Sequence, residues 1–146
     1  MSLQVGTIAI GSDHRARHIV DGLASHLEPL GWAVHKFYGG DSDCVDYPCT
    51  ANEVANEITS GQASCGVLIC GSGIGMSMAA NKVDGIRAAL VHEPLAAEMS
   101  RRHNDANVLC MAANGPIDSD YNTIIDTWLA TDFEGGRHQR RVSMMR

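Results

Sequence analysis

Residues 70–75, Cys70-Gly71-Ser72-Gly73-Ile74-Gly75, form a glycine-rich stretch between two segments of different pattern. The segment before it, 65–69, is an apolar run that predicts a buried strand. The segment after it, 76–82, is rich in Ala and Met, which favour a helix. Glycines at every second position between a strand and a helix let backbone N–H groups converge on an anion. The stretch predicts an anion-binding turn or, in the plainer interpretation, an ordinary turn between strand and helix.

Cys70 places a thiol at the start of this turn. A cysteine beside a helix N-terminus is more readily a thiolate. A thiolate that faces several amide donors is a base or nucleophile beside an oxyanion hole. The alternative is that Cys70 is only a small buried residue. The six residues alone leave both interpretations open.

The rest of the chain alternates between short apolar strands and segments with helical spacing. Strands are predicted at 7–10, 32–37, 67–70, 86–91 and 108–112, and helices at 19–30, 51–61, 76–82, 93–103 and 117–128. This alternation is typical of βαβ units around a parallel sheet. We therefore expect one α/β domain over residues 1–146. It is a three-layer α/β/α sandwich with a Rossmann-like, five-stranded parallel sheet.

Composition narrows the class of protein. The chain has 146 residues, of which 45% are hydrophobic and 19% charged, as in a compact domain with a real core. A net charge of −6 argues against a nucleic-acid partner, and no apolar run is long enough for a membrane span. Residues 1–10 lack the pattern of a signal peptide, so we expect a cytoplasmic protein with reduced thiols. Five cysteines without CxxC spacing also argue against a complete disulfide framework.

Ligands of open parallel sheets bind beyond the carboxyl ends of the strands. Asp13 and His14 follow the first predicted strand, and Cys70 ends the third. His103 instead ends a helix that points away from this edge, so a single chain is not expected to bring it near Cys70. A site at the interface of two subunits would bring them together. Taken singly, Asp13 is also explained as a helix N-cap and His103 as a surface histidine at a helix C-terminus.

Other candidates have plainer explanations. Methionine at position 76 leaves the dinucleotide fingerprint G-x-G-x-x-G incomplete, which argues against nucleotide binding. The basic residues of 134–141 are explained either as a solvated chain end or as a short helix presenting Arg137 and Arg141 to a phosphate. We expect purely structural roles for the remaining histidines and cysteines without a suggested partner, namely His18, His26, His35, His92, Cys44, Cys49, Cys65 and Cys110.

Several separated segments match one family together and in order. They are Gly11-Ser12-Asp13-His14, Asp46-Tyr47-Pro48, residues 70–75, Ala79-Ala80-Asn81-Lys82, Gly85-Ile86-Arg87-Ala88, residues 100–107 and residues 134–142. Their order and spacing resemble type B ribose-5-phosphate isomerase, within the wider group that includes galactose-6-phosphate isomerase subunits. The match covers essentially the whole chain. The resemblance implies an aldose–ketose isomerase of carbohydrate metabolism, in the pentose phosphate pathway, that interconverts ribose 5-phosphate and ribulose 5-phosphate without metal or organic cofactor.

The same resemblance implies a role for each site residue. Cys70 is the base that moves a proton between C2 and C1 through an enediolate, and Ser72 shuttles the hydroxyl proton. The amides that face the oxyanion belong to the loop, including Gly71, Gly73, Ile74 and Gly75. His103 opens the sugar ring. The other substrate contacts fall to Asp13 and Asn104 for the hydroxyls, Arg137, Arg141 and His14 for the phosphate, and Tyr47. The family shares each site between two subunits, which implies a homodimer, with a tetramer as the alternative, and assigns residues 133–146 to an arm at the interface.

One departure from the family pattern bears on the substrate. After the fifth strand the family commonly has an arginine in the phosphate site, and the aligned position here is Asn114. An asparagine has no charge and cannot form a bidentate fork. The sequence therefore keeps two alternatives open beside ribose 5-phosphate: isomerisation of a four- or six-carbon sugar phosphate, and a non-catalytic subunit that only binds a sugar phosphate.

Overall fold

The computed structural model describes residues 3–39, 46–114 and 120–145, and its centre is a parallel sheet. The strands lie in the order β2-β1-β3-β5-β4, and each neighbouring pair is parallel. Their bounds are β1 Thr7–Ser12, β2 Ala33–Tyr38, β3 Cys65–Cys70, β4 Ala88–Leu90 and β5 Val108–Ala112. The expected five-stranded parallel sheet is thus confirmed, with β3 at its centre.

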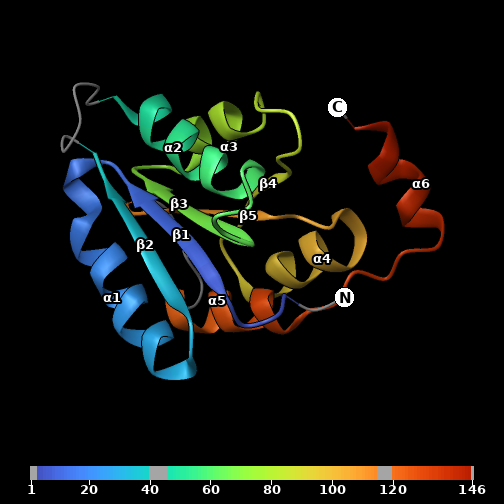
Figure 1. Cartoon of the computed structure of the whole chain (residues 1–146), viewed down its shortest axis with the longest axis horizontal. Helices are drawn as coiled ribbons and strands as arrows, with labels where there is room; N and C mark the ends of the chain where they lie inside the picture. The colour runs from blue at the N-terminus through green and yellow to red at the C-terminus, as the bar shows by residue number, and fades with distance from the viewer. Residues whose placement is uncertain (1–2, 40–45, 115–119, 146) are drawn as a thin grey trace.

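Helices cover both faces of the sheet (Figure 1). Their bounds are α1 Arg17–Leu27, α2 Tyr47–Thr59, α3 Ile74–Ala80, α4 Pro94–Asn104, α5 Tyr121–Ala130 and α6 Arg137–Met144, with short 3₁₀ helices at His14–Ala16 and Glu28–Leu30. Helices α2 and α3 pack on one face, and α1, α4 and α5 pack on the other. The three-layer α/β/α sandwich is confirmed. Helix α6 stands apart from the sandwich and contacts α4.

Three elements differ in extent from the sequence prediction. Helix α2 begins at Tyr47 rather than at 51, because Asp46 is extended and Pro48 is tolerated in the first turn. Helix α5 begins after Asp120, whose side chain accepts a hydrogen bond from the Thr123 amide at 2.7 Å; the predicted start at 117 lies outside the described residues. Strand β4 is shorter than 86–91, since the Arg87 amide donates to the Asn107 side chain, 2.7 Å away, instead of to a strand.

The core consists of two clusters, one on each face of the sheet. Trp128 and Leu109 belong to the cluster under α1, α4 and α5, and Leu68 and Met76 belong to the one under α2 and α3. Each such fully buried large side chain contributes roughly 1.5–3 kcal/mol. Strand β3 is buried at every position, as a central parallel strand covered on both faces must be. The core therefore fixes Cys70, the last residue of β3, in place.

The cysteines of the described residues fall into two groups. Cys65, Cys70 and Cys110 are free thiols, whereas Cys49 is disulfide-bonded, which corrects the expectation of reduced thiols at that position. Burial raises the pKa of Cys65 to about 12 and also raises the pKa of Cys110, so both stay protonated and fit the structural role expected for them. Cys44 lies outside the described residues. In the part of the chain that the structure describes, no helix is both long and apolar enough to span a membrane.

Candidate functional site

The carboxyl ends of β1 and β3 bring Asp13 and Cys70 to the same edge of the sheet. The Asp13 backbone N–H donates to the carbonyl oxygen of Ile69, the residue before Cys70, at 3.2 Å. The Asp13 carboxylate accepts a hydrogen bond from the Arg15 amide at 3.0 Å and so caps the 3₁₀ helix that follows, as the plainer interpretation predicted. The Cys70 side chain is nearly covered, with 7% of the residue exposed. The backbone of Asp13 therefore lies beside the end of β3 that carries the Cys70 thiol.

The glycine loop is held tightly against the neighbouring strands. Gly73 has φ +77°, in the left-handed region that favours glycine. A Cβ atom there would lie 2.5 Å from Leu90 Cδ1 and 3.1 Å from the backbone carbonyl of Met111. Within the loop, the Ile74 amide donates to Ser72 Oγ at 3.2 Å, so this predicted oxyanion donor is engaged by the Ser72 hydroxyl. The loop is thus a rigid turn that only glycine can form at position 73.

Two further predicted residues contact this loop. A Cβ atom on Gly75 would lie 2.6 Å from the Tyr47 ring, so the first residue of α2 closes directly over the first turn of α3. The Asn114 amide donates to the Gly71 carbonyl at 2.9 Å, which places the residue after β5 beside the loop. His14 is exposed at the same edge, where a Cβ on Gly39 would lie 2.9 Å from its backbone nitrogen. We call these residues the loop half: Asp13, His14, Tyr47, residues 70–75 and Asn114.

His103 and Asn104 lie elsewhere, in the last turn of α4. The helix ends at Asp105, which has φ +47° and whose N–H donates to the carbonyl of Arg101. The Asp105 carboxylate accepts hydrogen bonds from Arg101 at 2.8 Å and from Arg87 at 3.3 Å. Two arginines therefore fix the turn that carries His103 and Asn104.

This turn lies at the opposite edge of the sheet from Cys70. Asn107, in the segment after α4, accepts a hydrogen bond from the Gly66 amide near the start of β3, whereas Cys70 is the end of β3. The five residue steps of this strand span about 16 Å at roughly 3.3 Å per residue. Figure 1 shows the same separation, with the β1–α1 connection at the left and α6 at the right. One chain does not bring His103 to Cys70, as the sequence predicted.

Helix α6 joins the group around His103. The Arg102 side chain donates from Nε to Glu134 Oε1 at 2.7 Å, and the Glu134 amide donates to the Arg102 carbonyl at 3.1 Å. The His138 ring stacks on the His103 ring, with centroids 4.4 Å apart and an angle of 16° between the planes. Arg137 and Arg141 are exposed on α6, on the predicted short helix. We call this group the arm half: His103, Asn104, Glu134, Arg137, His138 and Arg141.

The charges of the arm half shift two pKa values. Hydrogen bonding to Arg102 holds the pKa of Glu134 below its ordinary value. Burial lowers the pKa of His138, and interaction with His103, Arg137 and Arg141 lowers it further, against the opposing effect of Glu134. His138 is therefore a neutral imidazole at pH 7.

Glu134 and His138 lie in the basic segment 134–141, and the sequence predicted no functional role for either of them. The available signal was spacing: His138 and Val142 are four residues apart and are the buried residues of α6. An amphipathic helix over this segment would have predicted that His138 packs against the rest of the domain.

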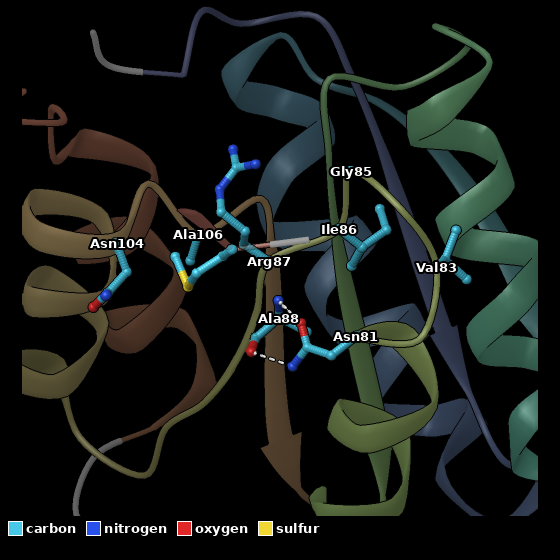
Figure 2. Close-up of a pocket in the computed structure, with 9 residues that line it drawn as sticks. Asn81, Val83, Gly85, Ile86, Arg87, Ala88, Asn104 and Ala106 are labelled. Atoms are coloured by element: carbon cyan, nitrogen blue, oxygen red, sulfur yellow. Dashed lines mark hydrogen bonds between the residues drawn. The ribbon is translucent and has the colours of Figure 1, made fainter. Parts of the chain in front are cut away.

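A cavity of about 360 Å³ opens beside the arm half (Figure 2). Asn104, Arg87 and Met145 contribute to its lining. Asn81 fixes the start of β4 there through two hydrogen bonds with Ala88, of 2.8 and 2.9 Å, which Figure 2 draws as dashed lines. Residues of the glycine loop do not line this cavity, so it belongs to the arm half.

Comparisons with known proteins give one consistent result. The family model of ribose/galactose isomerases matches residues 8–145. Ribose-5-phosphate isomerase B of Escherichia coli is 42% identical over 135 residues, which cover 92% of this chain and 91% of that protein. The solved structure of ribose-5-phosphate isomerase B from Clostridium thermocellum is 43% identical with a TM-score of 0.86, over 94% of this chain and 93% of that one. The type B ribose 5-phosphate isomerase structure from Trypanosoma cruzi is 42% identical with a TM-score of 0.87, over 96% and 95%.

These matches extend over nearly all of the described fold, including both halves of the candidate site. The chain belongs to the ribose/galactose isomerase family. It is a sugar-phosphate isomerase, and the family, fold and class of enzyme expected from the sequence are confirmed.

Proposed function

We propose that this enzyme interconverts ribose 5-phosphate and ribulose 5-phosphate at a site made of the loop half of one subunit and the arm half of a second. The observation that carries the proposal is the Cys70 thiol at the end of β3, where the Asp13 backbone contacts the preceding residue, in a chain whose relatives over nine tenths of its length are named as ribose-5-phosphate isomerases. The separation of His103 from Cys70 supports a site that needs two subunits. The oligomer is then a homodimer, with residues 133–146 as its interface arm.

The proton transfer falls to the loop half. The Cys70 thiolate removes the C2 proton of the open-chain aldose, and the electron pair moves through C1 to give an enediolate with negative charge on O1. Loop amides stabilise that oxyanion, and the Ser72 hydroxyl passes a proton between O1 and O2. Return of the proton from Cys70 to C1 gives the ketose. Each step needs a base near the carbon and donors near the new oxyanion, and the loop places both at one strand end.

Substrate capture and ring opening fall to the arm half. His103 protonates the ring oxygen and a water molecule accepts the proton of the C1 hydroxyl as the bond between C1 and the ring oxygen breaks, which yields the open-chain aldehyde. Arg137 and Arg141, exposed and one helical turn apart on α6, are suited to hold the phosphate, with His14 from the other subunit. Asp13, Asn104 and Tyr47 contact the rest of the sugar. We place the enzyme in the cytoplasm; the free thiols of Cys65, Cys70 and Cys110 fit a reducing compartment, whereas the disulfide at Cys49 does not.

The direct test is an assay of the purified protein with ribose 5-phosphate, together with Cys70→Ala. Loss of the general base lowers the rate by about 10²–10⁴-fold. The matched control is Cys65→Ala, since Cys65 is a buried thiol at the other end of the same strand and takes no part in the chemistry. That variant keeps its turnover and loses only stability. Full activity in Cys70→Ala would contradict the proposed base.

The second candidate substrate is a four- or six-carbon sugar phosphate. It is favoured by Asn114, a neutral residue of the loop half at a position where the family commonly has arginine. A weaker phosphate contact suits a sugar phosphate of different length. A panel of four-, five- and six-carbon aldose phosphates compared by kcat/KM decides between the candidates. Ribose 5-phosphate should have the highest value, and a higher value for another member would replace it.

A further inference from the structure

His138 is the residue of the arm half that the reaction described above does not use. Its imidazole lies face to face on that of His103, 4.4 Å between centroids, and 6% of the residue is exposed. Burying a histidine is costly unless it is neutral or paired. His138 is therefore buried and stacked on the histidine proposed to open the ring, at a cost in free energy that implies a role.

The neighbours of His138 come from each element packed around it. Glu134, in the segment before α6, lies with Oε2 3.4 Å from His138 Nε2, and His103 lies on the α4 side. Arg137 and Arg141 are on its own helix and add positive charge. Among the described residues, His138 Nε2 finds no hydrogen-bond partner. The surroundings thus favour a neutral ring that packs rather than one that carries a proton.

The same three groups are close enough to suggest a metal site, because ligand atoms of His103, Glu134 and His138 lie within 4.8 Å of one another. Two observations argue against that use. Arg102 already holds the Glu134 carboxylate through a hydrogen bond of 2.7 Å. The positive charges of Arg137 and Arg141 oppose a divalent cation in the same place.

We infer that His138 is a positioning residue for His103: its neutral ring, stacked on that of His103, fixes the plane in which His103 meets the sugar ring oxygen. The inference rests on the proposed function, in which His103 opens the ring. Glu134 and Arg102 support the same placement, because their hydrogen bonds hold the segment before α6 against Arg102, the residue before His103. Proton transfer depends on such placement, since small displacements of a reacting group cost up to about 10²-fold in rate.

The test compares a substrate that must open its ring with one that cannot form one. Ribose 5-phosphate closes a ring through O4, whereas the O4 of erythrose 4-phosphate carries the phosphate. In His138→Ala, kcat on ribose 5-phosphate should fall by about 10- to 100-fold, while kcat on erythrose 4-phosphate stays within about twofold. His138→Phe keeps a flat ring and loses only the nitrogens, of which Nε2 makes no hydrogen bond among the described residues, so it should recover most of the lost rate.

Two further variants make the result specific. His26→Ala is the matched control, because His26 pairs with Asp126 at 2.7 Å on the surface and belongs to neither half of the site nor to the arm; it should leave the kcat on both substrates unchanged. In the His103→Asn background, His138→Ala should cause no additional loss on ribose 5-phosphate, because a residue that acts through His103 has nothing left to position.

The outcomes separate this inference from the proposed function. If His103→Asn lowers the rates on both substrates equally, the ring-opening role of His103 is wrong and the positioning role falls with it. If His103→Asn is selective for ribose 5-phosphate but His138→Ala lowers both rates equally, or if His138→Phe recovers nothing, only the positioning role is overturned.

Discussion

Replacing Gly73 by alanine tests the geometry of the loop half most sharply. An alanine at φ +77° is strained by about 1–2 kcal/mol. Its Cβ would also lie 2.5 Å from Leu90 Cδ1, which can move, and 3.1 Å from the Met111 carbonyl, which is part of β5 and cannot. Overpacking of this kind costs about 1–3 kcal/mol. Gly73→Ala should therefore lower the free energy of unfolding by about 2–5 kcal/mol, a large part of the roughly 5–15 kcal/mol of a typical domain.

Two other glycines separate strain from crowding. Gly61 has φ +81° with open space around it, so Gly61→Ala should cost only about 1–2 kcal/mol. Gly22 is exposed within α1 and has no strained φ, so Gly22→Ala should stabilise by about 0.5–1 kcal/mol. Urea unfolding at fixed protein concentration, followed by the fluorescence of the two buried tryptophans, Trp32 and Trp128, measures all three. An equal cost for Gly73→Ala and Gly61→Ala would refute the tight packing of the loop against β4 and β5.

Three further predictions concern the phosphate and the arm. Arg137→Ala should raise KM for ribose 5-phosphate by about tenfold or more, measured by steady-state kinetics, because it removes a charge-assisted contact worth roughly 1.5–3 kcal/mol; an unchanged KM would exclude Arg137 from the site. Asn114→Arg should lower the same KM by a similar factor, and a higher KM would indicate a loop half shaped for another sugar phosphate. Docking of α6 should weaken on acidification. The docked state lowers the pKa of His138, so it loses stability as the pH falls below 6.5, the ordinary pKa of histidine. It also lowers the pKa of Glu134, so a second loss follows as the pH falls below 4.5. Hydrogen exchange of the α6 amides, corrected for intrinsic rates, should rise below pH 6.5, and constant protection down to pH 4 would contradict this.

Much of the fold follows from the sequence because the apolar period changes cleanly between strands and helices. The central strand β3 is the clearest case, since its unbroken apolar run is what burial on both faces requires. Helix ends were less predictable: α2 begins early because Asp46 and Pro48 can start it, and β4 is short because Asn107 takes the Arg87 amide. Neither the start of α2 nor the bond to Asn107 leaves a periodic signal in the sequence.

The candidate site was predictable in its residues and only partly in its geometry. The rule that ligands bind at carboxyl strand ends placed Asp13 and Cys70 together, and the direction of α4 placed His103 away from them. The contact between His138 and His103 joins α6 to α4 across many residues, and no spacing along the chain encodes it. The closure of Tyr47 over Gly75 has the same character, because it depends on how α2 packs on α3.

The central claim is that each site takes Cys70 from one subunit and His103 from another. Cys70→Ala and His103→Asn chains, each with little activity on ribose 5-phosphate alone, are mixed in equal amounts, unfolded and refolded together, and assayed. Half of the dimers then pair the two variants, and each such dimer holds one site with both residues intact and one with neither. The mixture should recover about a quarter of the wild-type activity. Activity no higher than the average of the two separate variants, in mixed dimers verified by tags of different mass, would contradict the shared site.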